Sequence, residues 1–334
     1  MEVLGDLFCT LRKDFVPLRL AAEGLGFLDL LCGFAGYARA TKAVRPEMVE
    51  EEDAPLAIKA GRHPTLERLL LDAGQDFEAV DYFLGEGCHF QLVTGHNGGG
   101  KSTYLQTLAQ LVILAQVGCF IPAQSARLRI SSSIFTRMGS SDSIEASASS
   151  FLVEMKEASH ILKSLAKDSL VLIDELGRGT AHADGLAICW AFCEKLLDSN
   201  VRCLFATHYF ELCQLQASHS ALRNMHLEQV EGDVRRYKVQ HISSLKTLEL
   251  KGASRYGLRA ALANGIPKSL VARASELAVL VDRALKVETH SLEQQLFALS
   301  LKCGDMDKEM LKEVLLELRK PYQKLEITDG SEKG

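Results

Sequence analysis

The chain has 334 residues, of which 47% are apolar and 24% are charged, and its net charge is −5. This length suits one large domain or two ordinary ones, and the composition is usual for a soluble globular protein. The negative charge gives no overall nucleic-acid signature, so any DNA contact has to be local or made by a region outside this sequence.

The cysteines and the apolar runs exclude further classes. None of the nine cysteines forms a C-x-x-C pair, and most lie in apolar segments. This predicts a reducing compartment with neither structural disulfides nor a zinc site. No apolar run approaches the ~18 residues that a membrane span needs, and the N-terminus lacks the basic-then-apolar layout of a secretory signal.

The first 45 residues are expected to be helical, because apolar residues recur at helical spacing from Leu18 to Phe34. Arg45-Pro46 should break this helix, and the acidic residues 47–53 are interpreted as a solvated connector. A short strand is predicted at residues 55–59. It is followed by a turn in which His63 is interpreted as a packing residue.

Residues 95–102 fit the phosphate-loop pattern G-x-x-x-x-G-K-[ST], with an apolar strand before them and a helix over 104–116 after them. Glycines let backbone N–H groups close around a phosphate, and the helix N-terminus adds its positive dipole. Lys101 is expected to reach the β- and γ-phosphates, and the Ser102 hydroxyl to bind Mg²⁺. The candidate phosphate-binding residues are Gly95, His96, Asn97, Gly98, Gly99, Gly100, Lys101, Ser102 and Thr103.

Short strands are predicted next, at residues 118–122 and 134–138. The serine-rich stretch 139–150 then leads into an amphipathic helix over 151–165. Serines ahead of a helix indicate a cap, and they also present hydroxyl and N–H groups to an anion.

The continuous apolar strand 169–173 has the character of a buried parallel strand, and it ends in Asp174-Glu175. A carboxylate at such a strand end, downstream of a phosphate loop, is the second magnesium-side element of nucleotidases. Asp174 is therefore expected to hold Mg²⁺, and Glu175 to act as general base on the attacking water. A helix is predicted over 184–197, and a strand over 203–206 follows it. Thr207-His208 comes directly after this strand, where His208 could sense the γ-phosphate.

The C-terminal third carries no predicted catalytic residue. Residues 222–230 and 234–242 alternate about a turn, which predicts a β-hairpin. Helices are predicted at 258–264 and 267–285, and one or two more across 286–325, whose apolar stripes indicate core or partner contacts. Residues 328–334 are expected to be disordered.

Six blocks of this sequence, in the same order, resemble the MutS family. They are TGHNGGGKSTYL (94–105), AQVGCFIPA (115–123), IFTRM (134–138), SSFLVEM (149–155), LIDELGRGT (172–180) and FATHYFEL (205–212). The stretches SDSIEASASSF (141–151), ELC (211–213) and YGLRAA (256–261) most resemble the eukaryotic meiotic branch, that of the fourth MutS homologue. The mismatch-repair paralogues share most of the six blocks.

The resemblance implies an α/β fold, namely a P-loop NTPase of the ABC type, with a mixed, mainly parallel sheet and flanking helices. It assigns residues 1–46 to the end of a helical lever region and 47–250 to the ATPase domain. It assigns 251–327 to C-terminal dimerisation helices and 328–334 to the tail. The family's mismatch-reading and connector domains are not in this sequence.

The resemblance also implies ATP and Mg²⁺ as cofactors, bound between two ATPase subunits. Residues 95–103 would bind the phosphates of the subunit's own ATP, Asp174 would support Mg²⁺, Glu175 would be the general base and His208 the switch histidine. Lys101 would serve in catalysis through its phosphate contact.

Three further residues match family positions. Ser149 would reach the γ-phosphate in the partner subunit, and Arg178 would lie near the composite site. Phe77 matches the aromatic that stacks on adenine, with core packing as the alternative. Two departures stand in the loop, where His96 and Gly98 replace the usual proline and methionine; a third, residues 181–183, replaces a more polar run.

The implied partners are double-stranded or branched DNA and a second MutS-type subunit. That subunit is the fifth homologue in the meiotic branch, and otherwise the same chain or another paralogue, with MutL-type proteins as further candidates and no membrane. The expected location is nuclear in a eukaryote and cytoplasmic in a bacterium.

Three functions are candidates for this sequence. The first is a DNA-binding ATPase of MutS type, which acts on Holliday-type junctions in the meiotic branch or on mispaired DNA in mismatch repair. The second, a transporter-type ABC ATPase, predicts a Leu-Ser-Gly-Gly-Gln-like signature where this chain has SASSF at 147–151. The third is an interaction subunit that binds ATP without hydrolysing it, and the intact Lys101, Asp174, Glu175 and His208 argue against it.

Overall fold

A computed structural model describes residues 2–51, 53–96, 98–138, 150–229, 237–241, 261–262 and 265–278. The chain divides into two compact units, residues 1–254 and 255–334. In the second unit, residues 268–278 are helical, within the helix predicted over 267–285. The segments predicted across 286–334 lie outside the described residues.

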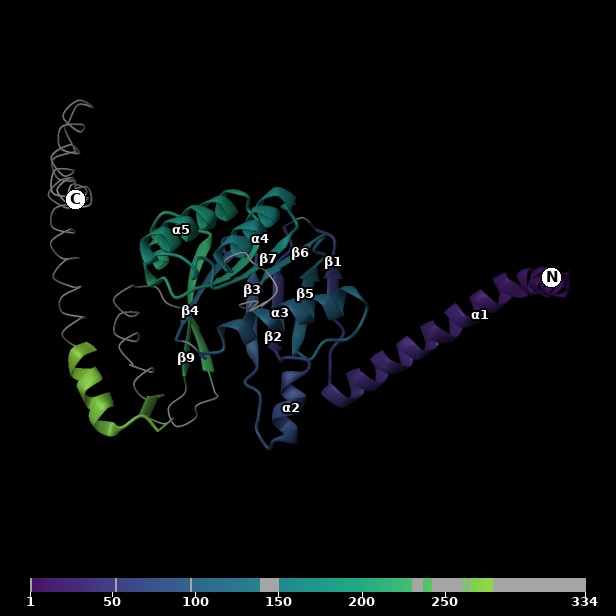
Figure 1. Cartoon of the computed structure of the whole chain (residues 1–334), viewed down its shortest axis with the longest axis horizontal. Coiled ribbons are helices and arrows are strands. Elements are labelled where there is room, and N and C mark those ends of the chain that lie inside the picture. The colour runs from purple at the N-terminus through teal and green to yellow at the C-terminus, as the bar shows by residue number, and fades with distance from the viewer. Residues whose placement is uncertain are drawn as a thin grey trace, which may run out of the picture. The chain divides into compact units, whose positions relative to one another are not determined.

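The first unit contains both helices and strands, which follow one another in mixed order along the chain (Figure 1). The helices are α1 (Glu2–Thr41), α2 (Leu66–Asp72), α3 (Lys101–Gln116), α4 (Ser150–Ser164) and α5 (His182–Asp198), with a 3-10 helix η1 (Phe210–Ala217). The strands are β1 (Glu47–Val49), β2 (Leu56–Gly61), β3 (Val80–Leu84), β4 (Phe90–Gly95), β5 (Ser125–Arg129), β6 (Ile134–Arg137), β7 (Leu170–Asp174), β8 (Arg202–Ala206), β9 (Leu222–Gln229) and β10 (Tyr237–His241).

The larger sheet has six strands in the order β10-β9-β4-β8-β7-β6. Strands β9, β4, β8, β7 and β6 are parallel, and β10 pairs antiparallel with β9. The predicted class, α/β with a mainly parallel sheet and flanking helices, is therefore confirmed, as are both strands of the predicted hairpin. A smaller sheet of four strands has the order β1-β5-β2-β3.

The central strands are buried on both faces, which explains their continuous apolar sequences. Alternate residues of each strand enter different cores. In β8, Cys203 and Phe205 join a core with α4, α5 and η1, whereas Leu204 and Ala206 join a core with α3 and the smaller sheet. Helix α3, which follows the phosphate loop, is thus packed between the two sheets.

Two predictions about connecting segments are wrong. Residues 118–122 form a turn and a loop in which Ile121 makes a single bridge to Val44, and the strand β5 follows three residues later. The apolar residue Ile121 is buried in the core although it lies in a loop, and this burial explains why the sequence resembles that of a strand. The acidic segment 47–53 is not wholly a connector, since β1 pairs with β5, where Arg127 Nε lies 3.6 Å from a Glu47 carboxylate oxygen.

Helix α1 is a single helix of 40 residues. Large apolar side chains along it, such as Leu25 and Phe27, are 69% and 61% exposed. None of the helices in the described ranges has the length and apolar character to cross a bilayer. The role of α1 as part of a lever stays a prediction.

The aromatic cluster around Phe205, a residue of β8, provides a test of the core packing. Phe205 is fully buried, with its ring centroid 6.4 Å from that of Phe90 and 6.5 Å from that of Phe192. We expect Phe205→Ala to lower the free energy of unfolding by about 3–5 kcal/mol, because it leaves a cavity that this packed core cannot close. Urea denaturation measures the change. The matched control, Phe120→Ala, removes a 40% exposed ring and should cost much less; equal losses would contradict this account of the core.

Candidate active site

Three neighbouring parallel strands end at the same edge of the larger sheet. Ala206 at the end of β8 is in register with Val93 of β4 on one side and with Asp174 of β7 on the other. The backbone ladder continues past these residues, since Thr207 N–H donates to Val93 O (3.0 Å) and Glu175 N–H donates to Ala206 O (3.0 Å). The phosphate loop after β4, the acidic pair after β7 and His208 after β8 therefore meet at one edge.

The loop between β4 and α3 has a backbone that its glycines make possible. Gly98 and Gly100 have φ values of 72° and 81°, in the left-handed region where glycine is unstrained. A Cβ on Gly99 would lie 2.7 Å from His96 O. Gly100 is also the N-cap of α3, so the loop brings backbone N–H groups and a helix N-terminus to the same place.

Lys101 lies inside this loop and is only 4% exposed. Its Nζ donates to the carbonyls of Gly95 (3.0 Å) and His96 (3.1 Å). Burial lowers the pKa of Lys101, and the charges of Glu175 and Asp174 oppose that shift. The His96 contact uses a backbone oxygen, so the departure from proline at this position leaves the lysine's partner in place.

Asp174 is a buried carboxylate, 5% exposed. Burial raises its pKa, and a hydrogen bond from Ser102 and the charge of Lys101 oppose the rise. Its Oδ1 has no hydrogen-bond partner among the described residues. A buried acceptor without a donor, next to a serine hydroxyl, fits a hard cation that prefers oxygen ligands.

Within the described residues, no group of three or more His, Cys, Asp or Glu side chains is arranged to hold a metal. Mg²⁺ at a phosphate loop needs only one or two protein oxygens, because substrate phosphates and water supply the others. Ser102 and Asp174 are the residues that would hold it, and the ion would neutralise charge on the phosphates.

Glu175 is surrounded by three basic side chains. Its Oε1 lies 2.5 Å from His208 Nε2 and 3.7 Å from Lys101 Nζ, and its Oε2 lies 2.5 Å from Arg178 Nη1. The hydrogen bond from His208, with the charges of His208, Lys101 and Arg178, lowers the pKa of Glu175 to about 2. A carboxylate with so low a pKa is a weak base, so it has to leave some of these partners before it can take a proton from water.

The backbone of Glu175 is also unusual, with a φ of 56°. A non-glycine residue in this region costs free energy and is held there by its surroundings. Here the Glu175 N–H bond to Ala206 and the three basic partners hold it.

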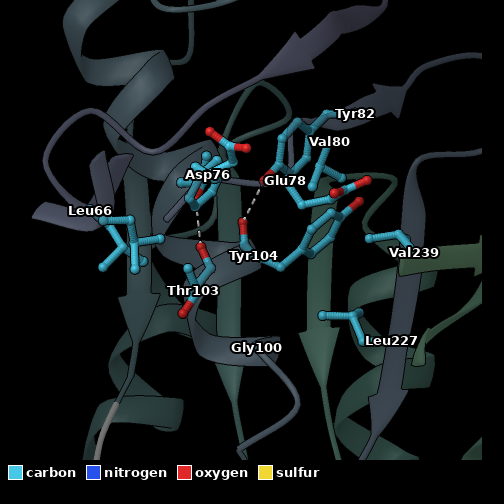
Figure 2. Close-up of a pocket in the computed structure, with 13 residues that line it drawn as sticks. Leu66, Asp76, Glu78, Val80, Tyr82, Gly100, Thr103, Tyr104, Leu227 and Val239 are labelled. Carbon is cyan, nitrogen blue, oxygen red and sulfur yellow. Dashed lines mark hydrogen bonds between the residues drawn. The ribbon is translucent and has the colours of Figure 1, made fainter. Parts of the chain in front are cut away.

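A cavity of about 210 Å³ adjoins the phosphate loop (Figure 2). Its wall is mostly apolar and aromatic, and Gly100 and Thr103 form the side next to the loop. The other lining residues are Leu66, Leu70, Asp76, Phe77, Glu78, Val80, Tyr82, Tyr104, Thr107, Leu227 and Val239. Phe77 is partly exposed and lines this cavity. Its stacking on adenine stays a prediction, and the cavity is a suitable place for the base.

Asn97 and Ser149 lie outside the described residues. The helix that follows Ser149 is described from Ser150 onward as α4. The structure thus brings together Lys101, Asp174, Glu175 and His208, with Arg178 beside Glu175.

The sequence reasoning missed a buried ion pair behind the acidic turn. Arg137 Nη2 lies 2.8 Å from Glu154 Oε1, and these side chains are 7% and 8% exposed. Two signals in the sequence could have indicated it. Arg137 is a charged residue near the end of a predicted strand, and Glu154 is an acid between apolar positions of a predicted helix.

Comparison with known proteins gives a consistent result. The family model for MutS domain V matches residues 91–282. DNA mismatch repair protein MutS of Chlorobaculum tepidum is 36% identical over 329 residues, which are 98% of this chain and 36% of that protein. MutS protein homolog 4 of Homo sapiens is 36% identical over 325 residues, 90% of this chain and 33% of that protein.

DNA mismatch repair protein MutS of Listeria monocytogenes is 39% identical over 282 residues, 83% of this chain and 32% of that protein. The chain therefore spans about a third of the length of these relatives.

The charge cluster around Glu175 predicts a pH dependence of stability. Because the folded protein lowers the pKa of Glu175 from 4.5 to about 2, the stabilisation is complete above the unfolded value and is lost as pH falls from 4.5 towards 2. We expect the free energy of unfolding of the unsubstituted protein (the parent) to fall more over this pH window than that of the Glu175→Gln variant. Urea denaturation at each pH measures both. The exposed Glu50→Gln is the control and should follow the parent; parallel curves for parent and Glu175→Gln would contradict the assignment.

Proposed function

The chain belongs to the MutS family, and from this membership we propose that it is an ATP-binding and ATP-hydrolysing module that switches a DNA clamp. The observation that carries the proposal is the meeting of Lys101, Asp174, Glu175 and His208 at one sheet edge beside the phosphate loop. These groups stand at the ends of three neighbouring strands, β4, β7 and β8, and together they match what phosphoryl transfer to water requires.

The roles follow from the contacts. Lys101 gives up its bonds to two loop carbonyls for the β- and γ-phosphates of ATP, since a phosphate is the stronger acceptor. Ser102 and Asp174 would hold Mg²⁺, and the ion would neutralise phosphate charge. When Lys101 turns to the phosphates, Glu175 loses one of its positive neighbours and becomes a stronger base.

His208 and Arg178 then decide where the freed carboxylate of Glu175 lies. His208 contacts the same Glu175 oxygen that faces Lys101, so it lies beside both the general base and the loop lysine. This location suits a residue that reports the presence of the γ-phosphate to the end of β8. The cavity that Phe77 lines would take the adenine.

The active form is a dimer of ATPase subunits that share composite sites. Support comes from the family membership and from the position of Ser149 directly before α4. ATP closes the two subunits on each other, hydrolysis reopens them, and the two states bias the DNA-holding parts of the assembly.

For the DNA ligand we propose branched recombination intermediates of Holliday type, as in the meiotic branch, with the fifth MutS homologue as partner and a nuclear location. The stretches at 141–151, 211–213 and 256–261 and the similarity to the human MutS protein homolog 4 support this choice. The second candidate is mismatch repair, with mispaired DNA as ligand. It is supported by the equal or higher identity to two bacterial proteins named DNA mismatch repair protein MutS.

Replacing the loop lysine tests nucleotide binding. We expect Lys101→Ala to weaken ATP binding by about 10- to 100-fold, the range for losing charged hydrogen bonds. Equilibrium titration with a fluorescent ATP analogue measures it, and the exposed Lys163→Ala serves as control. Unchanged affinity in Lys101→Ala would remove the phosphate loop from the proposal.

Replacing the acid tests the hydrolysis step. We expect Glu175→Gln to bind ATP and to hydrolyse it at least about 10²-fold more slowly, the effect of losing a general base. Steady-state phosphate release measures turnover, with ATP binding measured in parallel. Normal turnover would mean that another group activates the water.

The composite site predicts that specific ATPase activity rises with protein concentration. If activity stays near background at all concentrations while ATP still binds, the missing half of each site belongs to a different partner subunit. Greater stimulation of turnover by a four-way junction than by a mismatched duplex is expected for the meiotic branch, and the reverse order would favour mismatch repair.

A further inference from the structure

The buried pair of Arg137 and Glu154 connects α4 to the acidic turn that carries the proposed catalytic base. We define this catalytic turn as residues 174–179. Arg137 is the last residue of β6, and Glu154 lies in the second turn of α4. Their ion pair is 2.8 Å long, and neither side chain is more than 8% exposed.

Both members of the pair also bind the backbone of the catalytic turn. Glu154 Oε2 accepts a hydrogen bond from Gly177 N–H (3.1 Å), and Arg137 Nη1 donates to Asp174 O (3.4 Å). Each oxygen of Glu154 therefore has a different task, one towards Arg137 and one towards the turn. The peptide units that it and Arg137 bind lie on both sides of Glu175.

A residue that follows β8 also binds the turn. Tyr209 O–H donates to Gly177 O (2.9 Å), and Tyr209 follows His208 directly. Gly177 has a φ of 80°, and a Cβ there would lie 3.0 Å from Cys189 Sγ. The turn thus has little freedom to shift without its neighbours.

A second and independent contact joins α4 to the turn. A Cβ on Gly179 would lie 3.0 Å from Phe151 Cβ and 3.1 Å from Phe151 N, in the first turn of α4. The start of α4 is thus packed directly on the backbone of Gly179. A movement of α4 has to be transmitted to the turn through this packing and through Glu154.

Stability alone does not require this ion pair. Replacing a buried ion pair by well-packed apolar residues is often neutral or stabilising, because desolvation offsets much of the attraction. An apolar pair would lack the acceptor that fixes Gly177 N–H, two residues after Glu175. What the charged pair adds is geometry at the turn.

We propose that Arg137 and Glu154 are positioning residues that couple the position of α4 to that of Glu175. The coupling rests on the proposed function, in which Ser149, directly before α4, serves the nucleotide of the partner subunit. Each chain then connects its own catalytic base rigidly to the helix that serves the opposite site, so the state of one site acts on the other.

Two double variants separate geometry from charge and packing. R137M/E154L replaces the pair by apolar residues and removes the acceptor, whereas R137M/E154Q keeps an amide oxygen for Gly177 N–H. We expect R137M/E154L to lower kcat by at least about fivefold, the effect of one net hydrogen bond, with KM for ATP within about twofold. R137M/E154Q, which of the two backbone contacts lacks only the Arg137 contact to Asp174 O, should recover the share of turnover that depends on the Gly177 hydrogen bond. Equal losses in both variants would overturn the positioning role of Glu154.

Folding is checked by thermal unfolding of both variants. If R137M/E154L does not fold, Glu154→Asp replaces it, because it keeps the charge and draws the carboxylate back from Gly177. It is then expected to show the same loss of kcat at constant KM. Unchanged kcat in a folded Glu154→Asp or R137M/E154L variant would overturn the proposal.

Mixed dimers test the coupling between sites. The pair substitution is placed in a subunit that also carries Glu175→Gln, so that its own site is already inactive and hydrolysis comes from the other subunit. We expect turnover at that other site to fall by at least about threefold relative to dimers with Glu175→Gln alone, a fraction of the effect in cis. Unaltered turnover there would confine the pair to its own site and overturn the coupling.

A measurement without nucleotide keeps the inference separate from the proposed function. Amide hydrogen exchange of the catalytic turn should be faster by at least about fivefold in R137M/E154L than in R137M/E154Q, because only the latter keeps an acceptor for Gly177 N–H. If the parent chain hydrolyses no ATP, the proposed function fails, and this comparison still tests the connection. Equal exchange in both variants overturns it.

Discussion

The parallel ladder that joins β4, β8 and β7 is the constraint on which the site depends. The register of Ala206 with Val93 and with Asp174 brings the three strand ends level. Both faces of these strands are buried in packed cores, and within β4, β7 and β8 charged residues occur only at the strand ends. Phosphate loop, acidic pair and histidine therefore gather at one edge without any further arrangement.

Two adjacent carboxylates at this edge have opposite environments. Burial raises the pKa of Asp174, one of whose oxygens has no donor among the described residues, whereas the hydrogen bond from His208 and the charges of three basic groups lower the pKa of Glu175. Neighbouring acids with divergent environments commonly have different tasks. Here the buried one suits a cation, and the other is an ionised base held by basic groups that a nucleotide would compete for.

The backbone of the acidic turn shows how the same region is kept in place. Glu175 adopts a left-handed φ, and its neighbours Asp174 and Gly177 are bound through their peptide groups by Arg137, Glu154 and Tyr209. These contacts come from β6, α4 and the segment after β8. The strain at Glu175 is thus supported by elements that are far apart in the sequence.

The sequence by itself determined the α/β class and most of the central strands, and it supplied the candidate site residues that the structure brings to one sheet edge. Apolar runs, glycine spacing and strand-end acids are local signals, and their chemistry does not depend on distant neighbours. Only the tertiary structure decided the rest, because it depends on residues that meet across the fold. The pairing of β1 with β5, the loop at 118–122, the basic surroundings of Glu175 and the buried Arg137–Glu154 pair all arise from contacts between separate segments. A charge pattern along the chain cannot reveal which partner each charge will meet.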